Sequence, residues 1–346
     1  MTIVRYFWPF FLTLLGGCLA AFALGMRDGG LIAAVAALQS VIILAALESS
    51  QSLDNVVVVS KIVNDMSPRW QRCYQIYGFI IGMVGMRCAM PILLVSLIAW
   101  INPWTALQMA IHDQKQYASI LEHAEPMIMT FGGCFLGLLA TKKYFLNPER
   151  DTCWAFYEKP LMKISSVTSM PYLVIMAVLI ISTLLEAPAM QHGCLISGIA
   201  GMMTYIVVQD VIGAAAESSS EGAGKMDGLK GLLYVEMIDA SFSFDGVISA
   251  FAVTTDIVLI TLGLMIGAML TRCFIIANVR TQLMMNLPHL DAGAYTSIWL
   301  LSMLMFLKNT NLVTIPDVVT GFIGIVIIGV SVVTSLRALK REKAAA

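Results

Sequence analysis

The stretch YVEMIDASFSFDGVISAFAV, residues 234–253, places three carboxylates, Glu236, Asp239 and Asp245, in a segment that is otherwise apolar. No Lys or Arg lies within it. A segment of this length and composition is typical of a helix that crosses a membrane. Ionisable side chains are costly at that depth and mark ion or substrate pathways. The stretch therefore predicts an all-α, polytopic transmembrane protein with a buried polar site.

The composition of the whole chain agrees with this prediction. Its 346 residues are 58% hydrophobic and only 12% charged, whereas soluble domains are about 25% charged. The net charge of −1 gives no reason to expect a nucleic-acid partner. Apolar runs predict about ten membrane-spanning helices, at 7–25, 31–60, 76–101, 127–142, 171–187, 195–215, 231–253, 257–277, 294–308 and 313–336. The second run is too long for one straight span, which predicts a break within it.

The distribution of basic residues predicts the orientation of these helices. With the C-terminal tail in the cytoplasm and ten alternating spans, sixteen of the 21 Lys and Arg residues fall on the cytoplasmic side. Arg87 and Arg272 lie within spans, and the remaining three fall on the opposite side. Cytoplasmic loops of membrane proteins carry an excess of Lys and Arg. We therefore expect a multi-pass protein of the bacterial inner membrane with both termini in the cytoplasm.

An internal repeat relates the two halves of the chain. LESSQSLDNVV (47–57) aligns with IDASFSFDGVI (238–248), so Glu48 matches Asp239 and Asp54 matches Asp245. Further along, GFIIGMVGMRC (78–88) and GLMIGAMLTRC (263–273) both read G-x3-G-x4-R-C. Two matched motifs in the same order predict a repeat of five spans plus five, with the first membrane repeat at 1–190 and the second at 191–346.

An odd number of spans in each repeat inverts the second half relative to the first. Inverted repeats in transporters place the substrate site near the midplane, where the halves meet. We therefore expect the two acidic motifs to face each other. The largest connection, at 143–170, mixes charged and aromatic residues and predicts a cytoplasmic loop that could bind protein partners.

The ligand types of the expected site favour a hard divalent cation. The spans contain more acids of these motifs than arginines, so either some of the acids are protonated or a cation binds among them. The two arginines stand against five acids: Glu48, Asp54, Glu236, Asp239 and Asp245. Carboxylates suit Mn²⁺, Mg²⁺ or Ca²⁺, whereas zinc and copper favour imidazole or thiolate. Further oxygen ligands and charge-balancing groups are expected from Ser52, Asn55, Ser243, Arg87 and Arg272.

Helical spacing sorts these residues by face. Asp54 and Asp245 join the site only if their helices kink, and the adjacent Asn55 and Gly246 permit this. The following residues share a face in a regular helix: Glu48 with Ser52 and Asn55, and Glu236 with Asp239 and Ser243. Hydroxyl groups taken singly fit interhelical hydrogen bonding equally well.

The motifs LESSQSLDNVVV (47–58) and EMIDASFSFDGVISAFAVTT (236–255) resemble those of the TerC family of integral membrane proteins, named for tellurium resistance. The chain looks closest to a branch described only as an uncharacterised membrane domain, within a wider superfamily that includes lysine exporters. The resemblance covers nearly the whole chain and implies manganese efflux. By position it implies these metal ligands: Glu48, Asp54, Asn55, Glu236, Asp239 and Asp245.

The expected function is therefore divalent-cation transport, with Mn²⁺ as an exported substrate rather than a resident cofactor. An alternative is a non-transport membrane scaffold, or a metal-loading partner in a metal or tellurite stress-response complex. The loop at 143–170 motivates this alternative. We expect no enzymatic activity, because the matched acids do not form the motif of an intramembrane aspartyl protease. Membrane lipid and the divalent cation are the expected partners.

Overall fold

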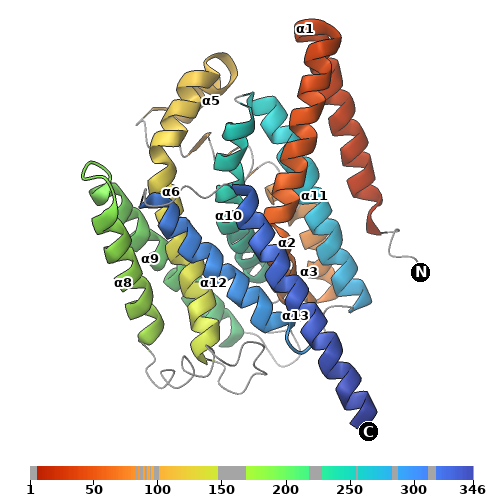
Figure 1. Ribbon diagram of the computed structural model, residues 1–346, viewed down its shortest axis with the longest axis vertical. Helices are drawn as coiled ribbons and strands as arrows, with labels where there is room; N and C mark the ends of the chain where they lie inside the picture. The colour runs from red at the N-terminus through yellow and green to blue at the C-terminus, as the bar shows by residue number, and fades with distance from the viewer. Residues whose placement is uncertain are drawn as a thin grey trace. The chain divides into compact units, whose positions relative to one another are not determined.

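The computed structural model is built of helices joined by turns throughout the part of the chain that it describes, which confirms the all-α class (Figure 1). Side chains at several helical positions, among them 53–55 and 240–249, are not described. The described backbone comprises residues 6–78, 80–82, 85, 89, 92–93, 95–96, 101–146, 169–217, 228–254, 256–282, 287–310 and 317–345.

Two compact units divide the chain, and each draws on both predicted repeats. The first unit comprises Met1–Glu125 and Asp227–Arg280, and the second comprises Pro126–Met226 and Thr281–Ala346. The chain therefore crosses between the units at three points. One crossing lies within a continuous helix, α6 (Gln114–Leu146), at Pro126.

In the first unit, α1 (Trp8–Gln51) reverses direction at Gly29 and Gly30, so it forms two helical arms (Figure 1). Gly30 has φ 71°, a backbone conformation that glycine adopts without strain. The two arms correspond to the first predicted span and to the start of the second. Ala21, Val41 and Ala45 of the two arms pack with Ile266 in one apolar cluster.

The second predicted span is divided at Ser52, where α1 ends and α2 (Leu53–Asn64) begins at the next residue. The N–H groups of Ser52 and Val56 still donate to the carbonyls of Glu48 and Ser52, at 3.1 and 3.3 Å, so this is an irregular turn and the hydrogen bonding continues across it. A short helix, α3 (Pro68–Cys73), and a π-helical turn, η2 (Tyr74–Gly78), follow. By contrast, α10 (Gly228–Val253) is a single helix that runs through Gly246.

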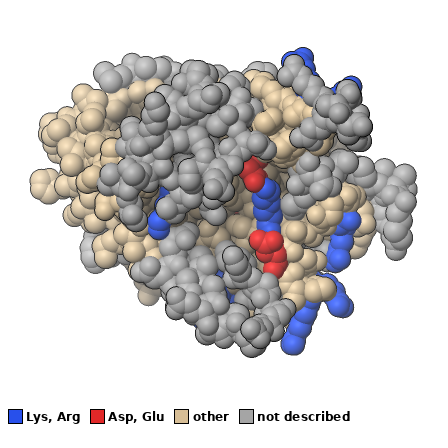
Figure 2. Space-filling model, turned by 90° about the horizontal axis from the view of Figure 1, so that it is seen from below, with Lys and Arg blue, Asp and Glu red and all other residues tan. Residues whose placement is uncertain are grey.

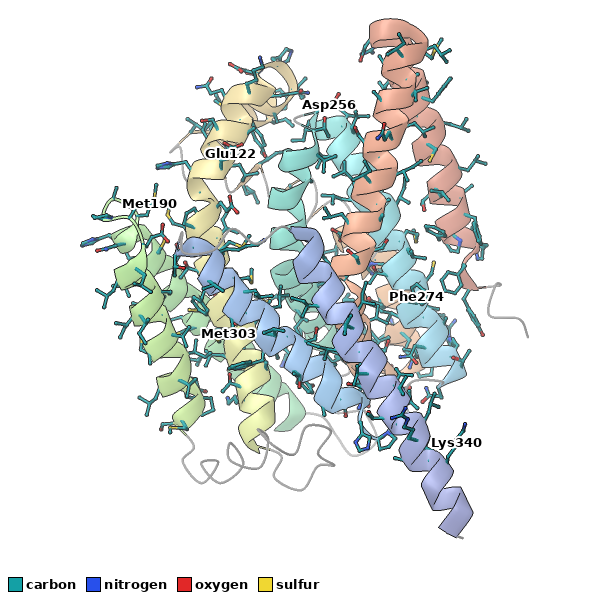
Figure 3. All side chains as sticks on the ribbon, in the orientation of Figure 1. Glu122, Met190, Asp256, Phe274, Met303 and Lys340 are labelled. Carbon is teal, nitrogen blue, oxygen red and sulfur yellow. The ribbon has the colours of Figure 1, made fainter. Side chains whose placement is uncertain are left out.

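Helix α10 is central to the first unit, because it packs against α1, α2, α3 and η2. A short turn joins it to α11 (Ile257–Thr281), which returns in the opposite direction (Figure 1). Asp256 begins α11, and its carboxylate accepts hydrogen bonds from the backbone N–H groups of Val258 and Leu259 at 2.8 and 3.3 Å. Such a cap satisfies donors that the first helical turn leaves unpaired. Figure 3 shows Asp256 at the end of α11 opposite Phe274.

The second unit begins within α6, which is longer than the predicted span 127–142. The helix extends through Pro126, although proline removes one backbone hydrogen bond. The Pro126 carbonyl accepts hydrogen bonds from the hydroxyl of Thr130 at 2.6 Å and from the amide of Asn309 at 2.9 Å. These two donors bind the carbonyl of the proline itself, whereas the backbone hydrogen bond that proline removes is the one its nitrogen would have donated. A helix that the sequence did not predict, α5 (Pro103–His112), precedes α6.

Four further helices complete the second unit: α8 (Met170–Leu185), α9 (Gln191–Glu217), α12 (Leu290–Asn309) and α13 (Asp317–Ala345). Helix α8 packs on α9 and α12, and α12 packs on α13. Within the predicted loop 143–170, residues 147–168 lie outside the described part of the chain. Residues 218–227, which follow α9, also lie outside it.

Within the described residues, five helical segments are long and apolar enough to cross a membrane: Trp8–Gln51, Gln114–Lys142, Ile257–Thr281, Leu290–Asn309 and Ile323–Lys340. Helix α8 is apolar but shorter. These segments make the chain compatible with a membrane protein. They overlap predicted spans with different bounds, because long apolar runs indicate the helices but not where each one ends.

Candidate functional site

A buried ion pair lies between α10 and α11 in the first unit. One guanidinium nitrogen of Arg272, Nη2, donates to both carboxylate oxygens of Glu236, at 3.2 and 3.3 Å. The same nitrogen lies 3.9 Å from a carboxylate oxygen of Asp239, one helical turn further along α10. Only 2% of Glu236 and 5% of Arg272 are exposed. Burial on this scale requires charge compensation, which the pairing supplies.

Tyr74 supports the guanidinium from a third segment of the chain. Its backbone carbonyl accepts a hydrogen bond from Arg272 Nη1 at 3.2 Å. The guanidinium carbon also lies 4.8 Å from the centre of the Tyr74 ring, within the range of a cation–π contact. Tyr74 is the first residue of the π-helical turn η2. Such turns alter the regular backbone pairing of a helix and recur at functional sites.

Two glycines allow this close approach. A Cβ atom added to Gly78 would lie 2.5 Å from Glu236 Oε1 and 2.7 Å from Arg272 Nη1. One added to Gly82 would lie 2.5 Å from Arg272 Nη2. Any larger residue at either position would therefore displace the ion pair. These are the two glycines of the first G-x3-G motif.

Glu48 occupies a second buried position, near the end of α1, with 2% of its surface exposed. The hydroxyl of Ser52, the residue at the junction of α1 and α2, donates to Glu48 Oε1 at 3.3 Å. A Cβ atom on Gly267 of α11 would lie 2.6 Å from Glu48 Cβ and 2.8 Å from the backbone oxygen of Ala45. Gly267 thus lets α11 lie directly against the acid-bearing part of α1.

The two G-x3-G motifs are used reciprocally. Gly78 and Gly82, from the first predicted repeat, lie against Glu236 of the second. Gly267, from the second repeat, lies against Glu48 of the first. Each motif therefore packs on the acid-bearing helix of the other half. All these residues belong to the first compact unit.

The structure brings together three of the predicted site residues, Glu236, Asp239 and Arg272, and it places Ser52 beside Glu48. Among the described residues, no three His, Cys, Asp or Glu side chains form a group that could hold a metal ion. The remaining predicted positions lie outside the description, as whole residues or as side chains: Asp54, Asn55, Arg87, Ser243 and Asp245.

Sequence reasoning missed the contribution of Tyr74. Its carbonyl is a backbone group, so no side-chain motif identifies it. The roles of Gly78 and Gly82 were also missed, although the repeated G-x3-G pattern contained the signal. Small residues spaced by four are typical of close helix contacts in membranes. That pattern indicates close packing without naming the packed partner.

Comparison with known proteins assigns the chain to a family. A family model described as "Protein of unknown function (DUF475)" matches residues 53–342. The chain therefore belongs to the DUF475 family. No curated protein and no solved structure matches it.

Proposed function

We propose that this protein is a polytopic membrane transporter that exports a divalent cation, with Mn²⁺ as the preferred substrate. The observation that carries the proposal is the burial of Glu48 and Glu236 among apolar helices of one compact unit, with the largely covered Asp239 beside Glu236. Buried acids at membrane depth are costly, and such residues characterise ion pathways. Their hard oxygen ligands favour Mn²⁺, Mg²⁺ or Ca²⁺ over softer metals.

The junction of α1 and α2 at Ser52 lies four residues after Glu48 and two before Asp54, so it is close in sequence to two of the proposed ligands. A complete site would combine the described acids with Asp54, Asn55 and Asp245, whose positions in the matched motifs motivate their inclusion.

The reciprocal glycine contacts support the inverted repeat. If an approximate two-fold axis relates the two halves, each half should make the same kind of contact with the other. Gly78 of the first half lies against Glu236 of the second, and Gly267 of the second half lies against Glu48 of the first. The composition of the compact units is consistent with this, since each unit contains segments of both halves. Alternating access in this class moves one such bundle against another.

We place the protein in the bacterial inner membrane with both termini in the cytoplasm. The excess of Lys and Arg in the predicted cytoplasmic segments supports this orientation. Figure 2 shows basic side chains at several places on the face seen from below. The relation to TerC-like manganese exporters rests on the two acidic motifs and is part of the same proposal.

Cellular metal content provides the direct test. Cells expressing the wild type under Mn²⁺ load should contain less Mn²⁺ than cells without it, as measured by mass spectrometry. We expect Glu48→Gln, Asp54→Asn, Asp239→Asn and Asp245→Asn each to abolish this decrease. Asp28→Asn is the matched control, because Asp28 is an exposed acid paired with its neighbour Arg27 at 2.9 Å.

Two outcomes would contradict the proposal. Unchanged Mn²⁺ in wild-type cells with normal membrane levels of the protein would exclude manganese export. An unimpaired decrease in all four acid variants would exclude the buried acids as the transport site. If Mn²⁺ export fails, the same cultures measured for Mg²⁺ and Ca²⁺ decide whether another divalent cation is transported.

A further inference from the structure

The carboxylates proposed to bind the cation already contact a positive charge that belongs to the protein. Arg272 Nη2 donates to both oxygens of Glu236 and lies 3.9 Å from Asp239. Its Nη1 is held by the Tyr74 carbonyl, and its guanidinium carbon lies over the Tyr74 ring. A metal ion that binds Glu236 must therefore compete with this guanidinium.

The surroundings of the guanidinium fit its shape closely. Gly78 and Gly82 leave room for its two terminal nitrogens and for nothing larger than hydrogen at their own Cα atoms. The tyrosine ring lies against the guanidinium, and the tyrosine carbonyl and the Glu236 carboxylate accept its N–H groups. A lysine ammonium lacks both the plane and the second nitrogen, so these contacts are specific to arginine.

We propose that Arg272 determines the charge selectivity of the cation site. It competes for Glu236 and Asp239, and it lets divalent cations bind while it excludes monovalent ones. This inference rests on the proposed transport of a divalent cation and adds the residue that discriminates between ion classes.

The physical reason is the difference in how strongly monovalent and divalent cations interact with the same carboxylates. At equal distance a divalent ion interacts with a carboxylate twice as strongly as a monovalent one. A sodium ion that displaces Arg272 exchanges one unit charge for another. It also breaks the hydrogen bonds of the guanidinium to Glu236 and Tyr74 and loses the ring contact. A divalent ion loses the same contacts but interacts twice as strongly with each carboxylate, which favours its exchange with Arg272 over that of sodium.

The test measures Mn²⁺ binding to the purified full-length chain by titration calorimetry in nanodiscs. Buffers contain sodium chloride or choline chloride at the same concentration, about 0.15 M, which keeps screening equal. We expect wild-type affinity to be the same in both salts. In Arg272→Gln, sodium should weaken Mn²⁺ binding about tenfold relative to choline, because sodium then competes for Glu236 and Asp239 without having to displace a guanidinium. The sodium sensitivity of Arg272→Lys should lie between those of the wild type and of Arg272→Gln.

Two further variants complete the experiment. Arg27→Gln is the control, because Arg27 is an exposed arginine on α1, and it should behave like the wild type. Gly82→Ala tests the inference without changing charge, since the added Cβ would lie 2.5 Å from Arg272 Nη2 and displace the guanidinium. We expect Gly82→Ala to become sodium-sensitive even if Arg272→Gln does not fold.

The outcomes separate the inference from the function on which it rests. If the wild type binds divalent cations and neither Arg272→Gln nor Gly82→Ala becomes sodium-sensitive, the selectivity role is wrong and the transport proposal stands. If the wild type already responds to sodium, the selectivity role is wrong as well. If the wild type binds none of Mn²⁺, Mg²⁺ and Ca²⁺, the proposed function fails, and the inference fails with it.

Discussion

The guanidinium of Arg272 is hydrogen-bonded to the backbone carbonyl of Tyr74, which lies 198 positions earlier in the chain, at 3.2 Å. The same side chain pairs with Glu236 on the neighbouring helix α10. One residue therefore joins segments from the two predicted repeats at a buried point. The acids of the candidate site are positioned by this contact as well as by their own helices.

Removing the charge of Glu236 should destabilise the first unit strongly. In Glu236→Gln the buried guanidinium of Arg272 loses the negatively charged carboxylate that accepts two of its hydrogen bonds. Breaking a buried ion pair from one side costs roughly 3–5 kcal/mol. We expect a clearly lower midpoint of thermal unfolding in detergent, measured by intrinsic fluorescence. Asp28→Asn, which changes an exposed pair, should leave the midpoint within error, and an equal effect of both substitutions would contradict the prediction.

Enlarging Gly267 should separate α11 from α1. In Gly267→Ala the new Cβ would lie 2.6 Å from Glu48 Cβ and 2.8 Å from the Ala45 carbonyl oxygen, and a backbone atom cannot move aside as a flexible side chain can. Overpacking of this kind costs about 1–3 kcal/mol. The readouts are thermal stability and Mn²⁺ export, and both should decrease.

Gly16→Ala is the matched control for that substitution. Gly16 also lies in a helix, but a Cβ atom added there would meet nothing within 4 Å beyond its own helical turn. Alanine there should be neutral or slightly stabilising, because alanine favours helices by up to about 1 kcal/mol over glycine. A similar loss in both variants would show that the contact with Glu48 is unimportant.

Ser52→Ala should weaken cation binding with little effect on folding. The hydroxyl donates to Glu48 Oε1 at 3.3 Å, so its loss costs about 1 kcal/mol and removes one contact that orients this carboxylate. We expect a several-fold higher half-saturating Mn²⁺ concentration in membrane vesicles. Ser49→Ala is the comparison, because the Ser49 hydroxyl donates to the Ala45 backbone and not to Glu48. Identical Mn²⁺ dependence of the two variants would remove Ser52 from the site.

The orientation can be tested with reporter fusions. A fluorescent protein attached to the C-terminus should fold and fluoresce, and alkaline phosphatase attached there should be inactive, because the tail is predicted to be cytoplasmic. Alkaline phosphatase inserted after Gly30, at the exposed reversal of α1, should be active. The reverse pattern at both sites would show that the topology is the opposite of the proposed one. If alkaline phosphatase were inactive at both sites, the reversal of α1 would not lie on the outer side of the membrane.

Much of the helical architecture could be predicted from the sequence. The apolar runs located many of the helices, and within the overlong second run the structure has an irregular turn at Ser52. The start of α6 was misplaced by thirteen residues, since the sequence prediction began it after Pro126 whereas the helix begins at Gln114. The Pro126 carbonyl accepts hydrogen bonds from Thr130 and from Asn309, and the second partner is distant in the sequence.

The helical class, the acids within apolar segments and the two G-x3-G motifs in matched order can all be read from the amino-acid sequence. These properties follow from local composition and spacing, which act within one helix. The pairing of Arg272 with Glu236, the hydrogen bond from the guanidinium to the Tyr74 carbonyl, and the packing of each glycine motif on the other half appear only in the folded chain. Helical periodicity specifies which face a residue occupies, whereas its partner depends on how separate helices pack.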